Sequence, residues 1–61
     1  MKIGDKVIVV NKRDKRYGLI AQVLEIERNM DWMTVKFNKR EYVLYNTNEV
    51  LLLEQAKFNL I

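Results

Sequence analysis

The sequence predicts a small all-β protein, a five-stranded antiparallel barrel. Two stretches carry this prediction, because each has the order strand, polar turn, strand. The first stretch runs from 4 to 23 and the second from 32 to 45, and both are rich in β-branched, aliphatic or aromatic residues. Together they fill most of a 61-residue chain, which is the size of one domain, so we assign residues 1–61 to a single domain.

The first strand is expected over 5–10. Because apolar side chains at alternate positions share one face of a strand, Val7 and Val9 should face the core. Residues 11–16 include no apolar side chain and predict an exposed loop. Gly18 follows this loop, where we expect a positive φ or a close approach of two backbone segments.

The second strand is expected over 19–28. Its apolar alternation shifts by one residue between Val23 and Leu24, which predicts a β-bulge. Residues 29–31 read as a turn, and the third strand, 32–37, alternates cleanly.

A two-residue connection at 38–39 leads to the fourth strand, 40–45. Asn38 tolerates positive φ, which suits a type I′ hairpin turn. Tyr42 and Tyr45 lie on opposite faces of this strand, so only one of them can belong to the core.

Residues 46–49 are polar and predict a single 3₁₀ turn, followed by a short last strand over 50–53. A helix over 49–61 is the rival interpretation, because apolar residues in it fall near helical spacing. The apolar C-terminal arm, 55–61, fits a helix, a sixth strand or an interface segment. Its apolar residues are Phe58, Leu60 and Ile61.

The composition favours a binding module over an enzyme. The chain has neither cysteine nor histidine, so it lacks the commonest metal ligands and the commonest general base, and we expect no metal and no cofactor. Glu25 and Glu27 share a strand face but read as solvated side chains. No charged-then-apolar leader follows Met1 and no apolar run approaches about 20 residues, so we expect a cytoplasmic protein without membrane insertion.

The net charge is +3, which suits an anionic partner. The loop after the first strand holds four of the 11 cations, and these are the first candidate contacts for phosphate. The alternative is a solvated loop that is polar because it lies outside the core. These four cations are Lys12, Arg13, Lys15 and Arg16.

Exposed aromatic residues are the second group of candidates. Alternation places Trp32 on the outer face of its strand, where it would stack on a base or contact a partner, unless the C-terminal arm covers it. Tyr17 adjoins the basic loop and Gly18. Three further cations cluster around the hairpin, where we expect them either to extend the basic surface or to blunt the sheet edge and keep the turn soluble. They are Lys36, Lys39 and Arg40.

The first half of the chain resembles the KOW motif of SH3-like barrels, which has Gly-Asp-x-Val-x-Val, a basic loop and a second glycine-containing segment. Ala21 stands where the motif has its last glycine. KOW modules occur in ribosomal proteins and transcription elongation factors, so the resemblance implies binding to RNA or to a transcription complex. The matching residues are Gly4, Asp5, Val7, Val9, Gly18, Val23 and Ile26.

A second stretch, 35–48, resembles the PsaE-type subunit of photosystem I, which is also an SH3-like barrel and helps to dock ferredoxin. The matching residues are Val35, Lys36, Phe37, Asn38, Lys39, Tyr42, Asn46, Thr47 and Asn48. Two functions therefore remain open. The first is a KOW-like module that contacts RNA, DNA or a nucleoprotein assembly. The second is an accessory subunit that docks on an acidic protein. A homodimer through the apolar C-terminal arm is compatible with either function.

Overall fold

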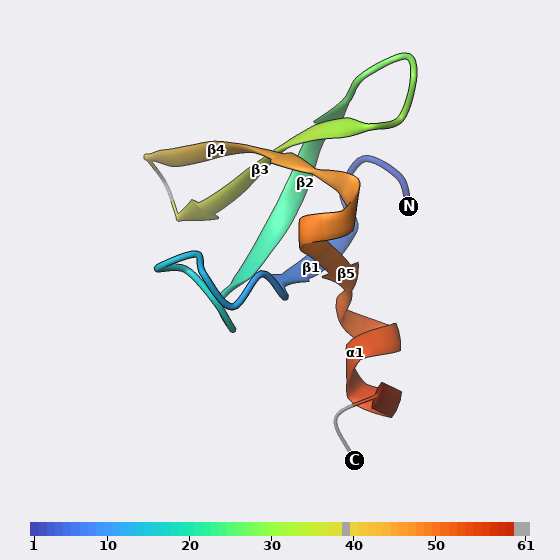
Figure 1. Ribbon diagram of the computed structural model, residues 1–61. Helices are drawn as coiled ribbons and strands as arrows, with labels where there is room; N and C mark the ends of the chain where they lie inside the picture. The colour runs from blue at the N-terminus through green and yellow to red at the C-terminus, as the bar shows by residue number, and fades with distance from the viewer. Residues whose placement is uncertain (39, 60–61) are drawn as a thin grey trace.

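The computed structural model describes residues 1–38 and 40–59, with side chains up to Ala56. Five strands form one antiparallel sheet in the order β4-β3-β2-β1-β5 (Figure 1). The strands are β1 (Lys6–Val9), β2 (Ile20–Ile26), β3 (Trp32–Asn38), β4 (Glu41–Asn46) and β5 (Val50–Leu52). The 3₁₀ helix η1 (Thr47–Glu49) precedes β5, as predicted, and the helix α1 (Leu53–Asn59) follows it.

Hydrogen bonds do not close this sheet into the expected barrel. β4 and β5 are its two edges, and no ladder joins them among the described strands. The reason is the length of β5, which pairs with β1 over only three residues before the chain turns into α1. The protein is therefore mostly β with an open sheet.

The core lies on the inner face of the sheet and is built from alternate residues of the strands. Val7 and Val9 are fully buried, as the alternation predicts. Of the two tyrosines in β4, Tyr45 is the core residue and Tyr42 is exposed. The buried cluster consists of Val7, Val9, Ala21, Val23, Met33, Val35, Tyr45 and Val50.

The predicted bulge in β2 is confirmed. Val23 pairs with Val35 of β3, but the next pair is Glu25 with Thr34, so one residue of β2 is left over between them. Such an extra residue bends a strand and increases its twist. In the curved sheet of Figure 1, β2 pairs with β1 through residues 20–22 and with β3 through residues 22–26, which include the bulge.

The β3–β4 hairpin differs from the prediction by one residue. Asn38 is the last residue of β3 and pairs with Glu41, and its φ is not positive, so the expected type I′ turn at 38–39 is wrong. The Asn38 side chain explains the difference, because its Oδ1 accepts from the backbone N–H groups of Arg40 and Glu41, each at 3.1 Å. Asparagine thus organises the turn through its side chain. Lys39 lies outside the described residues.

The C-terminal arm begins as a helix. The helical interpretation is confirmed for Leu53–Asn59 and wrong for 50–52, where β5 pairs with β1. Residues 54–57 are Glu, Gln, Ala and Lys, which are strong helix formers. Ala56 is buried, and α1 contacts β1 and β5. The apolar residues predicted to form an interface are Phe58, Leu60 and Ile61, and their side chains are not among those that the structure describes.

Gly18 provides a test of the predicted backbone constraint. Its φ is +83°, and an added Cβ would meet no atom within 4 Å, so a substitution strains the backbone without a clash. We expect Gly18→Ala to lower the free energy of unfolding by about 1–2 kcal/mol, because a left-handed conformation is unfavourable for a residue with a Cβ. Asparagine tolerates this region better, so Gly18→Asn should cost less. Urea denaturation of both variants measures the difference, and equal losses would contradict the explanation.

Candidate binding surface at the basic end

The loop between β1 and β2 is organised by two local side-chain turns. Asn11 Oδ1 accepts from the backbone N–H of Arg13 at 3.0 Å, and Asp14 Oδ1 accepts from that of Arg16 at 2.8 Å. The backbone N–H of Tyr17 also donates to the Asp14 carbonyl at 2.9 Å. Such Asx turns satisfy loop backbone groups without a sheet partner. The loop is therefore a series of compact turns that fixes where each cation leaves the backbone.

Arg16 joins this loop to the β3–β4 hairpin. Its Nε donates to Glu41 Oε1 at 2.5 Å, and its guanidinium carbon lies 5.7 Å from the centre of the Phe37 ring. The bond to Glu41 raises the pKa of the Arg16 guanidinium. Two segments 25 residues apart in sequence are thereby held side by side.

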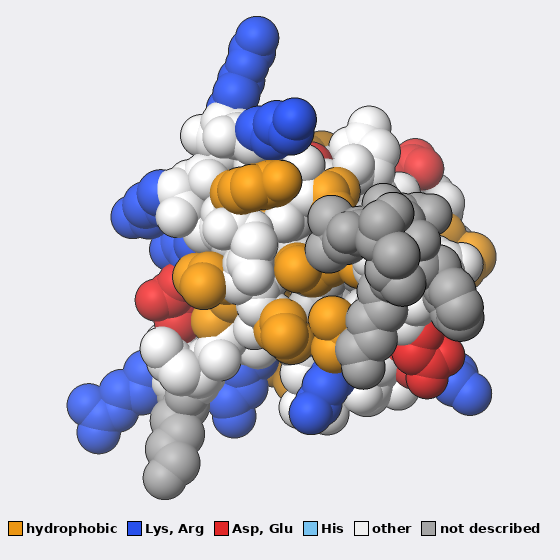
Figure 2. Space-filling model, turned by 90° about the horizontal axis from the view of Figure 1, so that it is seen from below, with side chains coloured by type: hydrophobic (Ala, Val, Ile, Leu, Met, Phe, Trp, Pro, Cys, Tyr) orange, Lys and Arg blue, Asp and Glu red, His pale blue; other side chains and the backbone are white. Residues whose placement is uncertain are grey.

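The remaining cations of these two segments are exposed, and we call them the basic end. They are Lys12, Arg13, Lys15 and Arg40. Figure 2 views the molecule from the side of the loop and α1, and shows Lys and Arg side chains projecting around a central apolar area. The structure thus brings together the loop cations and the hairpin cation that the sequence proposed separately.

Arg16, which the sequence places with the other loop cations, does not belong to this exposed set. Its side chain is only 23% exposed and is occupied by Glu41 and Phe37. No local pattern around Arg16 indicates these partners, because both lie in the second half of the chain. Glu41 and Phe37 are accordingly residues of the site that sequence reasoning missed.

Trp32 lies away from the basic end. It begins β3, whereas the hairpin follows the last residue of that strand, roughly 20 Å further along at the usual rise per residue. Its side chain is 41% exposed, which agrees with the predicted outer face. The described part of the C-terminal arm packs against β1 and β5, so the expected cover over Trp32 is not formed by these residues.

Two tyrosines flank the basic end instead. Tyr17 follows the loop and is exposed, and Tyr42 is exposed on β4 with the Lys36 ammonium 5.9 Å from the centre of its ring. Tyr17 also lines an apolar groove of about 310 Å³ together with Leu51 and Ala56. The sequence did not reveal this groove, because its far wall is the helix α1.

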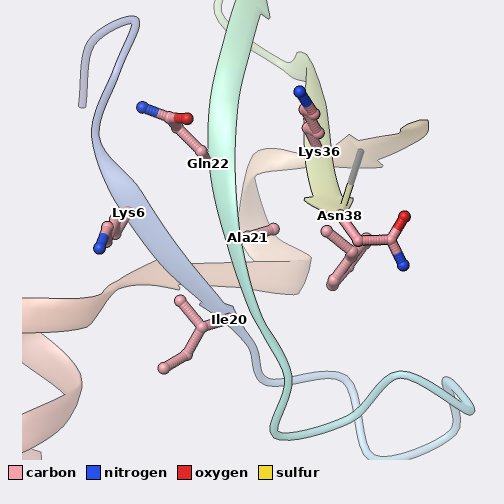
Figure 3. A pocket seen from close by; sticks show the side chains of 7 residues that line it. Lys6, Ile20, Ala21, Gln22, Lys36 and Asn38 are labelled. Atoms are coloured by element: carbon pink, nitrogen blue, oxygen red, sulfur yellow. The ribbon is translucent and has the colours of Figure 1, made fainter. Parts of the chain in front are cut away.

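A row of polar side chains crosses the outer face of the sheet beside the hairpin. Lys6 pairs with Gln22, and Gln22 pairs with Lys36, so the three lie on adjacent strands (Figure 3). They line a shallow hollow of about 340 Å³. The ammonium groups of Lys6 and Lys36 lie on either side of the Gln22 amide, where they can contact an anion. Lys6 was not predicted, because only the strand register places it opposite Gln22.

Tyr45 lies beneath the loop, against the Phe37 ring, with the ring centroids 6.1 Å apart in an edge-to-face arrangement. It is 2% exposed, and burial together with the nearby Asp14 carboxylate raises its pKa to about 12. No described residue forms a hydrogen bond with its hydroxyl group. The Asp14 pKa is lowered, mainly by the N–H of Arg16.

The described residues contain no cluster of acidic, histidine or cysteine side chains that could hold a metal ion. None of the helices in the same part of the chain is long and apolar enough to cross a membrane. Comparisons with protein-family models, with curated proteins and with solved structures find no match for this chain. A functional proposal therefore rests on the chemistry of the surface.

The two loop arginines should behave differently when they are removed. Arg16→Ala breaks the contacts with Glu41 and Phe37, so we expect a lower urea midpoint of unfolding. Arg13→Ala removes an exposed side chain from the same loop and should leave the midpoint unchanged within error. Urea denaturation followed by circular dichroism measures both, and equal midpoints would contradict the structural role of Arg16.

Tyr45 should make the protein sensitive to alkali. Its folded pKa is raised above the usual value of 10.0, so its contribution to stability is fully present below pH 10 and is lost as the pH rises towards about 12. We expect Tyr45→Phe to flatten this loss, with little cost at neutral pH because the hydroxyl has no hydrogen-bond partner among the described residues. Urea denaturation across this pH range measures the effect. The matched control is Tyr42→Phe, at an exposed ring, and a flattening of equal size there would contradict the assignment to Tyr45.

Proposed function

We propose that the protein is a non-enzymatic binding module for single-stranded RNA or DNA, which it contacts through the basic end. The observation that supports this proposal most is the gathering of exposed cations from the loop and the hairpin. The ion pair between Arg16 and Glu41 holds the loop and the hairpin together. Arg13 and Arg40 are therefore not required for this attachment, and both are exposed.

The chemistry of the surface suits a polyanion with flat bases. Each lysine or arginine that neutralises a phosphate releases a condensed counterion, which supplies a salt-dependent binding free energy. Tyr17 and Tyr42 flank the cations and offer exposed ring faces on which bases stack. Cations between stacking platforms are the usual arrangement in proteins that bind single strands.

An SH3-like, KOW-like architecture is part of this proposal. Support comes from the long first loop, the short hairpin and the 3₁₀ turn before β5. The motif glycines also support it, because Gly4 and Gly18 have φ values of +94° and +83°. A KOW-like role places the partner in a ribonucleoprotein or transcription complex. The lack of cysteine suits the reducing cytoplasm for such a protein.

Docking on an acidic protein is the second candidate. The observation that favours it is a set of exposed apolar side chains in and beside the basic loop. Figure 2 shows apolar side chains near the middle of this face, among Lys and Arg side chains. An apolar centre with a charged rim is the usual arrangement of a protein interface. The exposed apolar residues are Val10, Tyr17, Leu19 and Ile20.

Fluorescence anisotropy of a labelled, mixed-sequence single-stranded RNA tests the first candidate. If three phosphates are neutralised, affinity should fall roughly 20-fold between about 50 and 200 mM salt. The double variant Arg13→Ala/Lys15→Ala should weaken binding at the lower salt about tenfold or more and make the salt dependence shallower. A label on the RNA is preferable to Trp32 fluorescence, because Trp32 is remote from the basic end.

The matched control is Lys2→Ala/Arg28→Ala, which removes the same formal charge from exposed positions at the opposite end of the molecule (Figure 1). It should keep the affinity within about twofold. Equal losses in the two double variants would show that net charge, rather than the basic end, controls binding. No binding of RNA or of single-stranded DNA at the lower salt would overturn the proposal and favour protein docking.

A further inference from the structure

β4 is an edge strand of the sheet. The alternation of its hydrogen bonds with β3 shows which of its backbone groups point away from the sheet. The N–H of Thr47 donates to the Asp31 carbonyl at 2.9 Å, just beyond the ladder between β3 and β4. In an antiparallel ladder, hydrogen-bonded pairs alternate with non-bonded pairs. Val43 and Tyr45 therefore exchange hydrogen bonds with β3, whereas the N–H and C=O groups of Tyr42 and Leu44 point away from it.

These outward groups have no partner among the described residues. The backbone hydrogen bonds between different segments include none from Tyr42 or Leu44. The central residues of β4, 42–45, also lack the usual protection of an edge, because none of them is charged, proline or glycine. Tyr42 and Leu44 are each 56% exposed on the outer face. β4 thus combines free hydrogen-bonding groups with exposed apolar side chains.

We infer that β4 pairs antiparallel with β4 of a second copy of this chain, around a two-fold axis at Val43. This register places Tyr42 opposite Leu44 of the partner subunit, and both pairs of outward backbone groups bond reciprocally. A slip of one residue would pair outer-face with inner-face positions and expose core side chains. The two sheets then continue into one sheet with a common inner face.

The partner strand is a second copy of β4, because β4 is complementary to itself in this register. Tyr42 against Leu44 of the partner subunit is an aromatic–aliphatic cross-strand pair, which stabilises a sheet. Glu41 is the only charged residue of β4, and it faces Tyr45 of the partner subunit rather than a like charge. Glu41 is also neutralised by Arg16 of its own subunit. No repulsion therefore opposes the pairing.

Because the pairing uses a single six-residue strand, we expect it to bury less than the roughly 1,200 Å² typical of stable complexes, so the dimer should dissociate on dilution. The pairing of β4 does not depend on nucleic-acid binding.

Sedimentation equilibrium from about 10 µM to 1 mM, which brackets a weak Kd, should show a monomer–dimer transition. Leu44→Lys should abolish the dimer by adding a charge to the edge. The matched control, Leu19→Lys, introduces the same charge at a similarly exposed leucine outside β4 and should retain it.

A cross-link provides the second measurement. Val43 and its copy form a non-bonded pair on the axis, where Cα atoms approach to about 4.5 Å, within the range of a disulfide. The chain has no natural cysteine, so Val43→Cys with oxidised glutathione should give a disulfide-linked dimer and Leu19→Cys should not. Circular dichroism confirms that each variant is folded. A monomer over the whole range, a dimer that survives Leu44→Lys, or absence of the cross-link would overturn the inference.

Discussion

The contact of Arg16 with Glu41 and Phe37 fixes the arrangement on which the candidate surface depends. It attaches the loop between β1 and β2 to the start of β4, above the buried Tyr45 ring. Because the attachment uses one cation internally, the other cations of the loop remain available on the outside. A single arginine therefore separates the structural function of the loop from its proposed contact with a partner.

The small size of the chain explains why this attachment matters. A domain of about 60 residues buries only about 60% of the surface that its unfolded chain exposes. The inner face of the sheet supplies a core of mainly small side chains, with Met33 and Tyr45 as the larger members. Such a core leaves few contacts to order a loop. The loop is ordered instead by its own asparagine and aspartate turns and by Arg16.

Features that depend on neighbouring residues could be predicted from the sequence. Val7 and Val9 follow alternation, the bulge follows a phase shift, and Gly18 follows a loop that must reverse the chain. The features that escaped prediction depend on distant residues. The partner of Arg16 lies 25 residues away, and the open edge results from how soon β5 gives way to α1. The turn of the hairpin was predicted wrongly for a local reason. Asn38 organises the turn by accepting hydrogen bonds through its side chain and does not adopt a positive φ.

The extra residue between Val23 and Glu25 has a consequence for how the chain tolerates changes of length. In a regular strand, the loss or gain of one residue exchanges the inner and outer faces of everything that follows. At a bulge, one residue is already unpaired, so the segments before and after it keep their own alternation. A change of one residue at Leu24 alters the bend of β2, whereas the same change between Ala21 and Val23 would turn one of these two core side chains outward. The bulge is thus the position in β2 where a change of length does not exchange core and surface side chains.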